Sequence, residues 1–223
     1  MQAPRVTGVF HHNHILSAWL IVIAGVIDGL DGAIAKWLGK TGTFGIEFDS
    51  LSDITVFAVA PSTLLYACFY QGHSVFFVLV PFLYLGAATY RLARYNTNAL
   101  QSPRKPLIGL TTPMSAIIVV AVVLLVADYH RLGAIQEVSW ITRGAITGLA
   151  LVNSLLMVST IEFYTLEAYC VRRKKRIILP LVAVVVPLLL LRFKLPAVSL
   201  FMLGLFYVAE SLGRWLLQTK NKF

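Results

Sequence analysis

Residues 14–70 have the sequence HILSAWLIVIAGVIDGLDGAIAKWLGKTGTFGIEFDSLSDITVFAVAPSTLLYACFY. Two long apolar runs flank a short turn at 39–42, which begins and ends with glycine. Two aspartates precede that turn and two follow it. Each run is long enough to cross a membrane, which takes about 20 residues of α-helix. The stretch therefore predicts two antiparallel membrane helices, 14–38 and 44–70, with carboxylates near the end where they meet.

The rest of the chain continues this apolar pattern. Of its 223 residues 58% are hydrophobic, whereas soluble domains are about 45–50% apolar. Five more apolar runs predict helices at about 74–95, 107–127, 141–163, 177–191 and 196–217. Because the connections are short, we expect an all-α fold: a polytopic transmembrane bundle of about seven helices, forming a single domain over residues 1–223.

Basic residues predict how the bundle sits in the membrane. The formal charge is +9, but the Lys and Arg residues form short clusters between apolar runs. That arrangement favours contact with membrane lipids and argues against nucleic acid as a partner. If the C-terminal ends of the first, third, fifth and seventh helices share a side, that side holds 14 of the 19 basic residues. The positive-inside rule makes it the cytoplasmic side, so we expect a multi-pass protein with its acidic cluster at the cytoplasmic face.

The acidic cluster consists of Asp28, Asp31, Asp49 and Asp53. The spacings i,i+3 and i,i+4 place each pair on one helix face, so the two pairs are able to face each other. Four facing carboxylates repel strongly, and a bound divalent cation relieves that repulsion; oxygen ligands favour Mg²⁺ or Mn²⁺, as one ion or two. The alternative, simple helix-end charges, suits Asp49 near a helix N-terminus but not Asp28 and Asp31 near a C-terminus.

Small and basic residues near the aspartates allow two interpretations. Gly32, Ala35 and Gly45 either make room for a ligand or let helices pack closely. Arg91 and Arg94 end the predicted third helix. They either anchor that helix at the membrane surface or bind an anionic group.

Taken together, the pattern Asp28-x2-Asp31-Gly32-x2-Ala35-Lys36-x8-Gly45-x3-Asp49-x3-Asp53 resembles the signature of the CDP-alcohol phosphotransferase family. That signature normally has Arg where this chain has Lys36, which keeps the charge and loses the planar fork. Residues 44–53, 57–61, 91–96, 109–113 and 156–159 look like the phosphatidylserine synthase branch of the family. The family normally has a further membrane helix before the first aspartates, and the resemblance implies that this helix is absent from the sequence given.

The resemblance implies an enzyme that transfers a phosphatidyl group from CDP-diacylglycerol to the hydroxyl of L-serine, with release of CMP. It also implies a homodimer. The implied roles are metal binding for Asp28, Asp31, Asp49 and Asp53, catalysis as general base for Asp53, contact with the CDP-lipid for Gly32, Ala35, Lys36 and Gly45, and contact with serine or the lipid phosphate for Arg91, Arg94 and Asn96.

Two other functions stay open from the sequence. The same fold and chemistry could serve another acceptor, glycerol 3-phosphate or inositol phosphate. A cation transporter also places carboxylates in membrane helices, but usually near the middle of the membrane and at broken helices. Here all four aspartates are predicted at one face, which favours an enzyme that acts at the membrane surface.

Overall fold

The computed structural model describes residues 12–38, 43–101, 107–133, 138–163 and 196–220. Its helical elements are α1 (His12–Leu38), α2 (Thr43–Asp53), η1 (Ile54–Val59), α3 (Ala60–Leu65), η2 (Tyr66–Tyr70), α4 (Val75–Gln101), α5 (Thr112–Arg131), α6 (Trp140–Val158) and α9 (Pro196–Lys220). The run from α2 to η2 is one continuous rod in which η1 and η2 are π-helical turns. Two short strands, β1 (Leu107–Ile108) and β2 (Glu162–Phe163), pair antiparallel.

Five of these helical segments are long and apolar enough to cross a membrane: Glu47–Tyr70, Val75–Thr97, Thr112–Arg131, Trp140–Val158 and Ala197–Trp215. In α1 the apolar part is the shorter segment Asn13–Asp28. The prediction of an all-α membrane bundle is confirmed, and the chain is an integral membrane protein. The predicted helix at 177–191 lies outside the described residues, so a total of seven helices stays a prediction.

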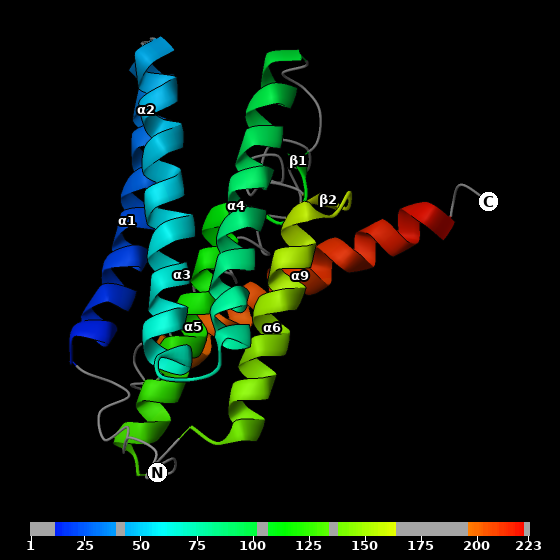
Figure 1. Cartoon of the computed structure of the whole chain (residues 1–223). Coiled ribbons are helices and arrows are strands. Elements are labelled where there is room, and N and C mark those ends of the chain that lie inside the picture. Colours follow the sequence, from blue (N-terminus) through cyan, green and yellow to red (C-terminus); the bar gives the residue numbers. More distant parts are fainter. Residues whose placement is uncertain (1–11, 39–42, 102–106, 134–137, 164–195, 221–223) are drawn as a thin grey trace.

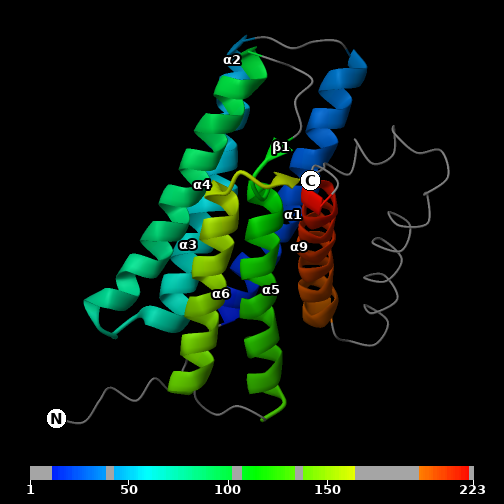
Figure 2. The same ribbon diagram turned by 90° about the vertical axis from the view of Figure 1, so that its right-hand side faces the viewer.

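From α1 through the rod of α2 to η2, α4 and α5 to α6 the chain alternates in direction, whereas α9 runs the same way as α6, with α5 at the centre of the bundle (Figure 1 and Figure 2). α5 packs against α1 on one side and α9 on the other, while α4 packs against α6. Its valines explain the central position, because Val119, Val120 and Val123 are almost completely buried. α1 packs against η1 and α3, whereas Figure 2 shows its C-terminal end splayed away from α2. The two helices therefore open towards the end that carries the aspartates.

Two predicted helix boundaries were wrong. The helix predicted from residue 107 begins at Thr112, because Gly109 has a positive φ of 82° and Pro113 favours the first turn of a helix. The helix predicted to reach residue 163 ends at Val158. β1 lies just before α5, and β2 lies just after α6. Next to this pair of strands, the N–H groups of Gly109 and Leu110 donate to the carbonyls of Ile161 and Leu156, respectively.

Candidate active site

The open end between α1 and α2 contains a cavity of about 330 Å³, which we call the acidic cavity. Three of the four predicted aspartates line it: Asp28 from α1, and Asp49 and Asp53 from α2. Gly45 also lines it, and a Cβ at this position would have no atom within 4 Å. The structure thus brings together carboxylates from two helices, as the spacing predicted. Its other lining residues are Ala24, Ile27, Phe48, Ser52, Val56 and Phe57.

Asp53 is partly buried, whereas Asp49 is exposed. The Asp53 side chain forms a hydrogen bond with Asp28 and interacts electrostatically with Asp28, Asp49 and Arg91. Its Oδ1 atom is buried and, within the described part of the chain, has no hydrogen-bond partner. A buried carboxylate oxygen without a donor is costly, and a bound ligand or metal ion is one group that would satisfy it.

A π-helical turn holds Asp53 in place. η1 begins directly after Asp53, and in a π-turn the backbone hydrogen bonds shift from the i+4 to the i+5 residue. The Phe57 carbonyl in this turn accepts a hydrogen bond from the buried Tyr84 hydroxyl at 3.1 Å. Ser115 Oγ donates in turn to Tyr84 Oη at 3.2 Å. This chain of hydrogen bonds joins the helix that carries Asp53 to α4 and α5.

Arg91 approaches the same region from α4 and is only 5% exposed. Its Nη1 donates to Thr112 Oγ1 at 3.2 Å, and its guanidinium lies 5.4 Å from the centre of the Tyr95 ring. Its Nε is buried and, like Asp53 Oδ1, unpartnered among the described residues. Arg91 and Asp53 interact electrostatically but form no ion pair in the part of the chain that the structure describes.

Arg94, one turn further along α4, is placed very differently. Its Nη1 donates to the Val158 carbonyl, and its Nη2 lies within hydrogen-bond distance of the carbonyls of Ile108, Met157 and Ser159, all at 2.9–3.1 Å. These carbonyls belong to β1 and to the C-terminal end of α6, where helix carbonyls otherwise lack donors. Arg94 therefore joins three segments of the bundle.

Asn96 on α4 is linked to the acidic cavity through a hydrogen bond to Ser50 on α2. Its Nδ2 donates to Ser50 Oγ at 2.9 Å, and Ser50 is adjacent to Asp49. Sequence reasoning missed Ser50, Tyr84 and Tyr207. Tyr207, on α9, interacts with Arg91 and hydrogen-bonds to Thr111. No sequence signal links Tyr207 to Arg91, because more than a hundred positions separate them and a tyrosine in an apolar helix is ordinary.

The remaining predicted residues, Asp31, Gly32, Ala35 and Lys36, lie in α1 beyond Asp28. Their side chains lie outside the described part of the structure. Among the described residues, no three His, Cys, Asp or Glu side chains are grouped closely enough to hold a metal ion.

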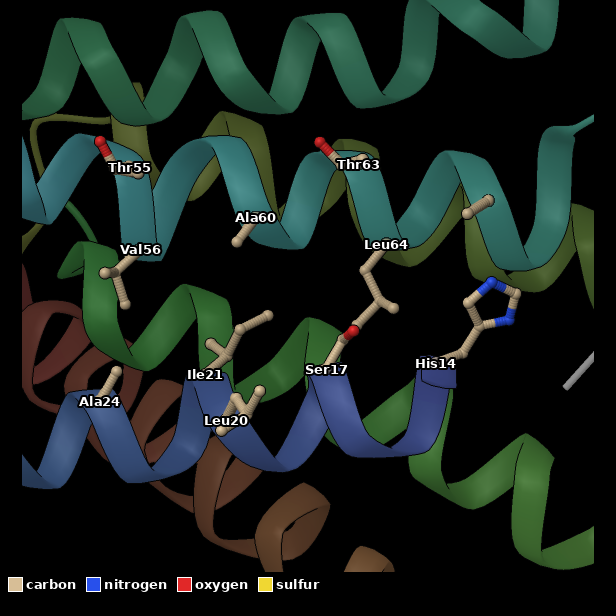
Figure 3. A pocket seen from close by; sticks show the side chains of 11 residues that line it. His14, Ser17, Leu20, Ile21, Ala24, Thr55, Val56, Ala60, Thr63 and Leu64 are labelled. Atoms are coloured by element: carbon tan, nitrogen blue, oxygen red, sulfur yellow. The ribbon is translucent and has the colours of Figure 1, made fainter. Parts of the chain in front are cut away.

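A second cavity, of about 520 Å³, continues from the first between α1 and α3 (Figure 3). Ala24 and Val56 line both cavities. Figure 3 shows Leu20, Ile21 and Leu64 along its length and His14 at its far end. We call it the apolar cavity, because its hydroxyl groups bind their own helix backbones: Ser17 to Asn13, Thr55 to Leu51 and Thr63 to Val59.

Comparison with known proteins identifies the family. The model of the CDP-alcohol phosphatidyltransferase family matches residues 4–158, which include the whole acidic cavity. The chain belongs to this family.

Three of its relatives carry two different names. The CDP-diacylglycerol–serine O-phosphatidyltransferase of Helicobacter pylori strain J99 is 34% identical over 207 residues, covering 92% of this chain and 81% of the relative. The protein of the same name from Methanocaldococcus jannaschii is 33% identical over 144 residues, covering 65% of this chain and 61% of the relative. An archaetidylserine synthase of Methanothermobacter thermautotrophicus is 30% identical over 146 residues, covering 65% of this chain and 56% of the relative.

Proposed function

We propose that the protein transfers a phosphatidyl group from CDP-diacylglycerol to the hydroxyl of L-serine, giving phosphatidylserine and CMP. The observation that carries this proposal is the acidic cavity, in which carboxylates from two helices meet and the Oδ1 atom of Asp53 has no partner among the described residues. The family match and the names of the relatives support the reaction and both substrates. We expect one domain over residues 1–223, and a homodimer, as for the family.

Asp53 is the general base in this proposal. Its Oδ1, which has no partner among the described residues, is an acceptor for the proton of an attacking hydroxyl. A positioned carboxylate that removes this proton typically contributes about 10²–10⁴-fold to the rate. The Tyr84–Phe57 hydrogen bond supports the role by fixing the turn that follows Asp53.

The carboxylates also fit a divalent cation. Asp28, Asp31, Asp49 and Asp53 would hold Mg²⁺ or Mn²⁺, as one ion or two, because these ions prefer oxygen ligands and the acidic cavity brings carboxylates from two helices together. When bound, the cation offsets the negative charge of the diphosphate and of the departing CMP. The chain's own contribution is to supply carboxylates from two helices that open enough to admit a diphosphate.

The CDP-lipid lies along α1 and the start of α2 in this proposal. Gly45 leaves open space at the wall of the acidic cavity. Gly32, Ala35 and Lys36 follow Asp28 at helical spacing, so they continue its face of α1 and are assigned to the cytidine and the diphosphate. Arg91, Arg94 and Asn96 form the basic and polar side of the site, towards serine or the lipid phosphate.

The apolar cavity is the proposed place for a lipid chain. It starts at Ala24 and Val56, where the acidic cavity ends, and runs between α1 and α3 towards the opposite face of the membrane. A chain seated there would leave water for an apolar surface, which stabilises binding by about 0.8 kcal/mol per buried CH₂ group. The headgroup would then sit at the end with the aspartates, which we propose is the cytoplasmic face.

The test is CMP release from CDP-diacylglycerol by the purified protein in lipid nanodiscs. L-serine, glycerol 3-phosphate and inositol phosphate are compared as acceptors, each with Mg²⁺, with Mn²⁺ and with EDTA. We expect release that requires both serine and a divalent cation. Release with another acceptor instead of serine would keep the reaction class and change the substrate, whereas release that is unaffected by EDTA would contradict the metal role.

A further inference from the structure

The C-terminal part of α4 contacts two separate parts of the bundle through two polar side chains, Arg94 and Asn96. The guanidinium of Arg94 donates to main-chain carbonyls of β1 and of the end of α6, at 2.9–3.1 Å. Asn96 Nδ2 donates to Ser50 Oγ on α2 at 2.9 Å. Residues two apart on a helix point in different directions, because each residue turns the helix by about 100°. α4 therefore holds α2 on one side and the end of α6 on another.

Gly109 shows how closely the Arg94 contacts are packed. It has a positive φ of 82°, and a Cβ at this position would lie 2.3 Å from the Met157 carbonyl oxygen and 2.6 Å from Arg94 Nη2. Glycine therefore leaves room for the guanidinium between these main-chain groups. Gly109 N–H also donates to the Ile161 carbonyl at 2.8 Å. Through Arg94, α4 is thus fixed to the main chain of two other segments.

The Asn96 contact lies beside a carboxylate of the acidic cavity. Ser50 directly follows Asp49, which lines that cavity and is exposed. The C-terminal end of α1 splays away from α2 (Figure 2), so the hydrogen bond from Asn96 supports α2 from its other neighbour, α4. The position of Asp49 therefore depends on α4.

We propose that Arg94 and Asn96 are positioning residues, which hold the Asp49 carboxylate at the acidic cavity by fixing α2 to the rest of the bundle through α4. This inference rests on the proposed function and gives the two residues a role that needs no contact with a substrate. A carboxylate or phosphate that took the donors of Arg94 would leave the carbonyls at the end of α6 without them. In the same way, a ligand of the Asn96 amide N–H group would compete with Ser50.

The test is a double-mutant cycle on the contact between α4 and α2, with Asn96→Ala, Ser50→Ala and the double variant of the full chain in lipid nanodiscs. The Kd for Mn²⁺ is measured without either substrate, from the EPR signal of the free ion, and the KM for serine from CMP release. Because the contact acts on Asp49 through the adjacent residue, we expect each single change to raise the Kd for Mn²⁺ about 3–10-fold. The double variant should bind Mn²⁺ no more weakly than either single variant, and the KM for serine should change less than about two-fold.

Thr97→Ala is the matched control for this cycle. Thr97 follows Asn96 on α4, and its hydroxyl binds the Ala93 carbonyl of its own helix, so its loss should change neither quantity. A rise in the KM for serine in Asn96→Ala, with Ser50→Ala like wild type, would assign Asn96 to the substrate and overturn the inference. Additive effects of the two changes on the Kd for Mn²⁺ would also overturn it, because the two residues would then act independently.

Arg94→Lys tests the other side of α4, because a single ammonium group cannot replace a guanidinium that donates to carbonyls of several segments. Arg143→Lys is its control, since Arg143 donates to the carbonyls of Phe69 and Val138 at the other end of the bundle. Both variants should lower the unfolding temperature, but only Arg94→Lys should also weaken Mn²⁺ binding. Gly109→Ala should have the same effect as Arg94→Lys, because its Cβ would displace the guanidinium. Unchanged Mn²⁺ affinity in both variants would overturn the inference, and if neither folds, the cycle on the half-buried Asn96 decides it.

These outcomes are separate from those that test the proposed function. If wild-type protein releases no CMP with serine, the proposed reaction fails, and the Mn²⁺ measurements still decide the inference. If wild-type protein releases CMP but binds no Mn²⁺, the proposed metal role fails and the cycle is measured in kcat instead. A coupled loss of kcat in Asn96→Ala and Ser50→Ala would then support the inference, and additive losses or no loss would overturn it.

Discussion

Two cavities lie between the same pair of helices, share Ala24 and Val56, and differ in how their polar groups are satisfied. In the apolar cavity every described serine and threonine hydroxyl binds its own helix backbone. In the acidic cavity Asp53 Oδ1 has no partner among the described residues. Within the described part of the chain, internally satisfied hydroxyls are typical of the wall of an apolar passage, whereas an unsatisfied carboxylate oxygen is typical of a binding site.

The largest expected effect comes from removing the unsatisfied charge. Asp53→Asn keeps the shape of the side chain but removes the base, so turnover should fall about 10²–10⁴-fold while the KM for CDP-diacylglycerol changes much less. The measurement is initial CMP release at saturating serine and metal. Glu47→Gln is the control, because Glu47 is an exposed acid on α2 that does not line the acidic cavity.

A loss in turnover below about ten-fold would remove Asp53 from the chemistry. Equal losses in turnover and in CDP-diacylglycerol affinity would assign it to metal or substrate binding alone. Either result would weaken the contrast between the two cavities, since the unsatisfied atom would then no longer mark the reacting centre.

The next effect concerns the junction of the cavities. Ala24→Phe places a ring where a lipid chain would pass from one cavity into the other. Excluding two CH₂ groups from an apolar site costs about 1.6 kcal/mol, so the KM for long-chain CDP-diacylglycerol should rise about ten-fold. A short-chain CDP-lipid should be affected much less. Ala93→Phe, at an exposed position on α4, controls for the added ring.

The same KM rise for short-chain and long-chain CDP-lipids would contradict this use of the apolar cavity. It would show that residue 24 acts on the headgroup, and the two cavities would then be parts of one headgroup site.

A smaller effect on activity is expected when the buried hydrogen bond from Tyr84 to the η1 carbonyl of Phe57 is removed. Tyr84→Phe removes the buried hydroxyl that donates to the Phe57 carbonyl and accepts from Ser115 Oγ. We expect a loss of about 1–3 kcal/mol in stability, measured by thermal unfolding in detergent, and a fall of a few fold in CMP release as Asp53 loses its fixed position. Tyr129→Phe, at an exposed position on α5, should change neither quantity. Full stability in Tyr84→Phe would show that the π-turn needs no such support.

Much of this arrangement could be predicted from the sequence, because it depends on local patterns. The apolar runs gave the helices at 14–38 and 44–70 within a few residues, and the spacing of the aspartates gave the faces that line the acidic cavity. What could not be predicted depends on distant contacts. Arg94 looked like a substrate or surface residue, and only the fold brings it to the carbonyls at the end of α6. The pairing of β1 with β2 likewise joins segments more than fifty residues apart.

The smallest effect is expected where the hydroxyls are already satisfied. Thr63→Val removes a hydroxyl that binds the Val59 carbonyl of its own helix, while the side chain keeps its size in the wall of the apolar cavity. Because that carbonyl belongs to a helical turn and the valine is apolar, stability should change by less than about 0.5 kcal/mol, and CMP release should stay the same. The check is thermal unfolding and the KM for CDP-diacylglycerol, measured beside Asp53→Asn. A marked rise in that KM would mean that Thr63 contacts a polar part of the lipid, so the polar part of the CDP-lipid would extend beyond the acidic cavity.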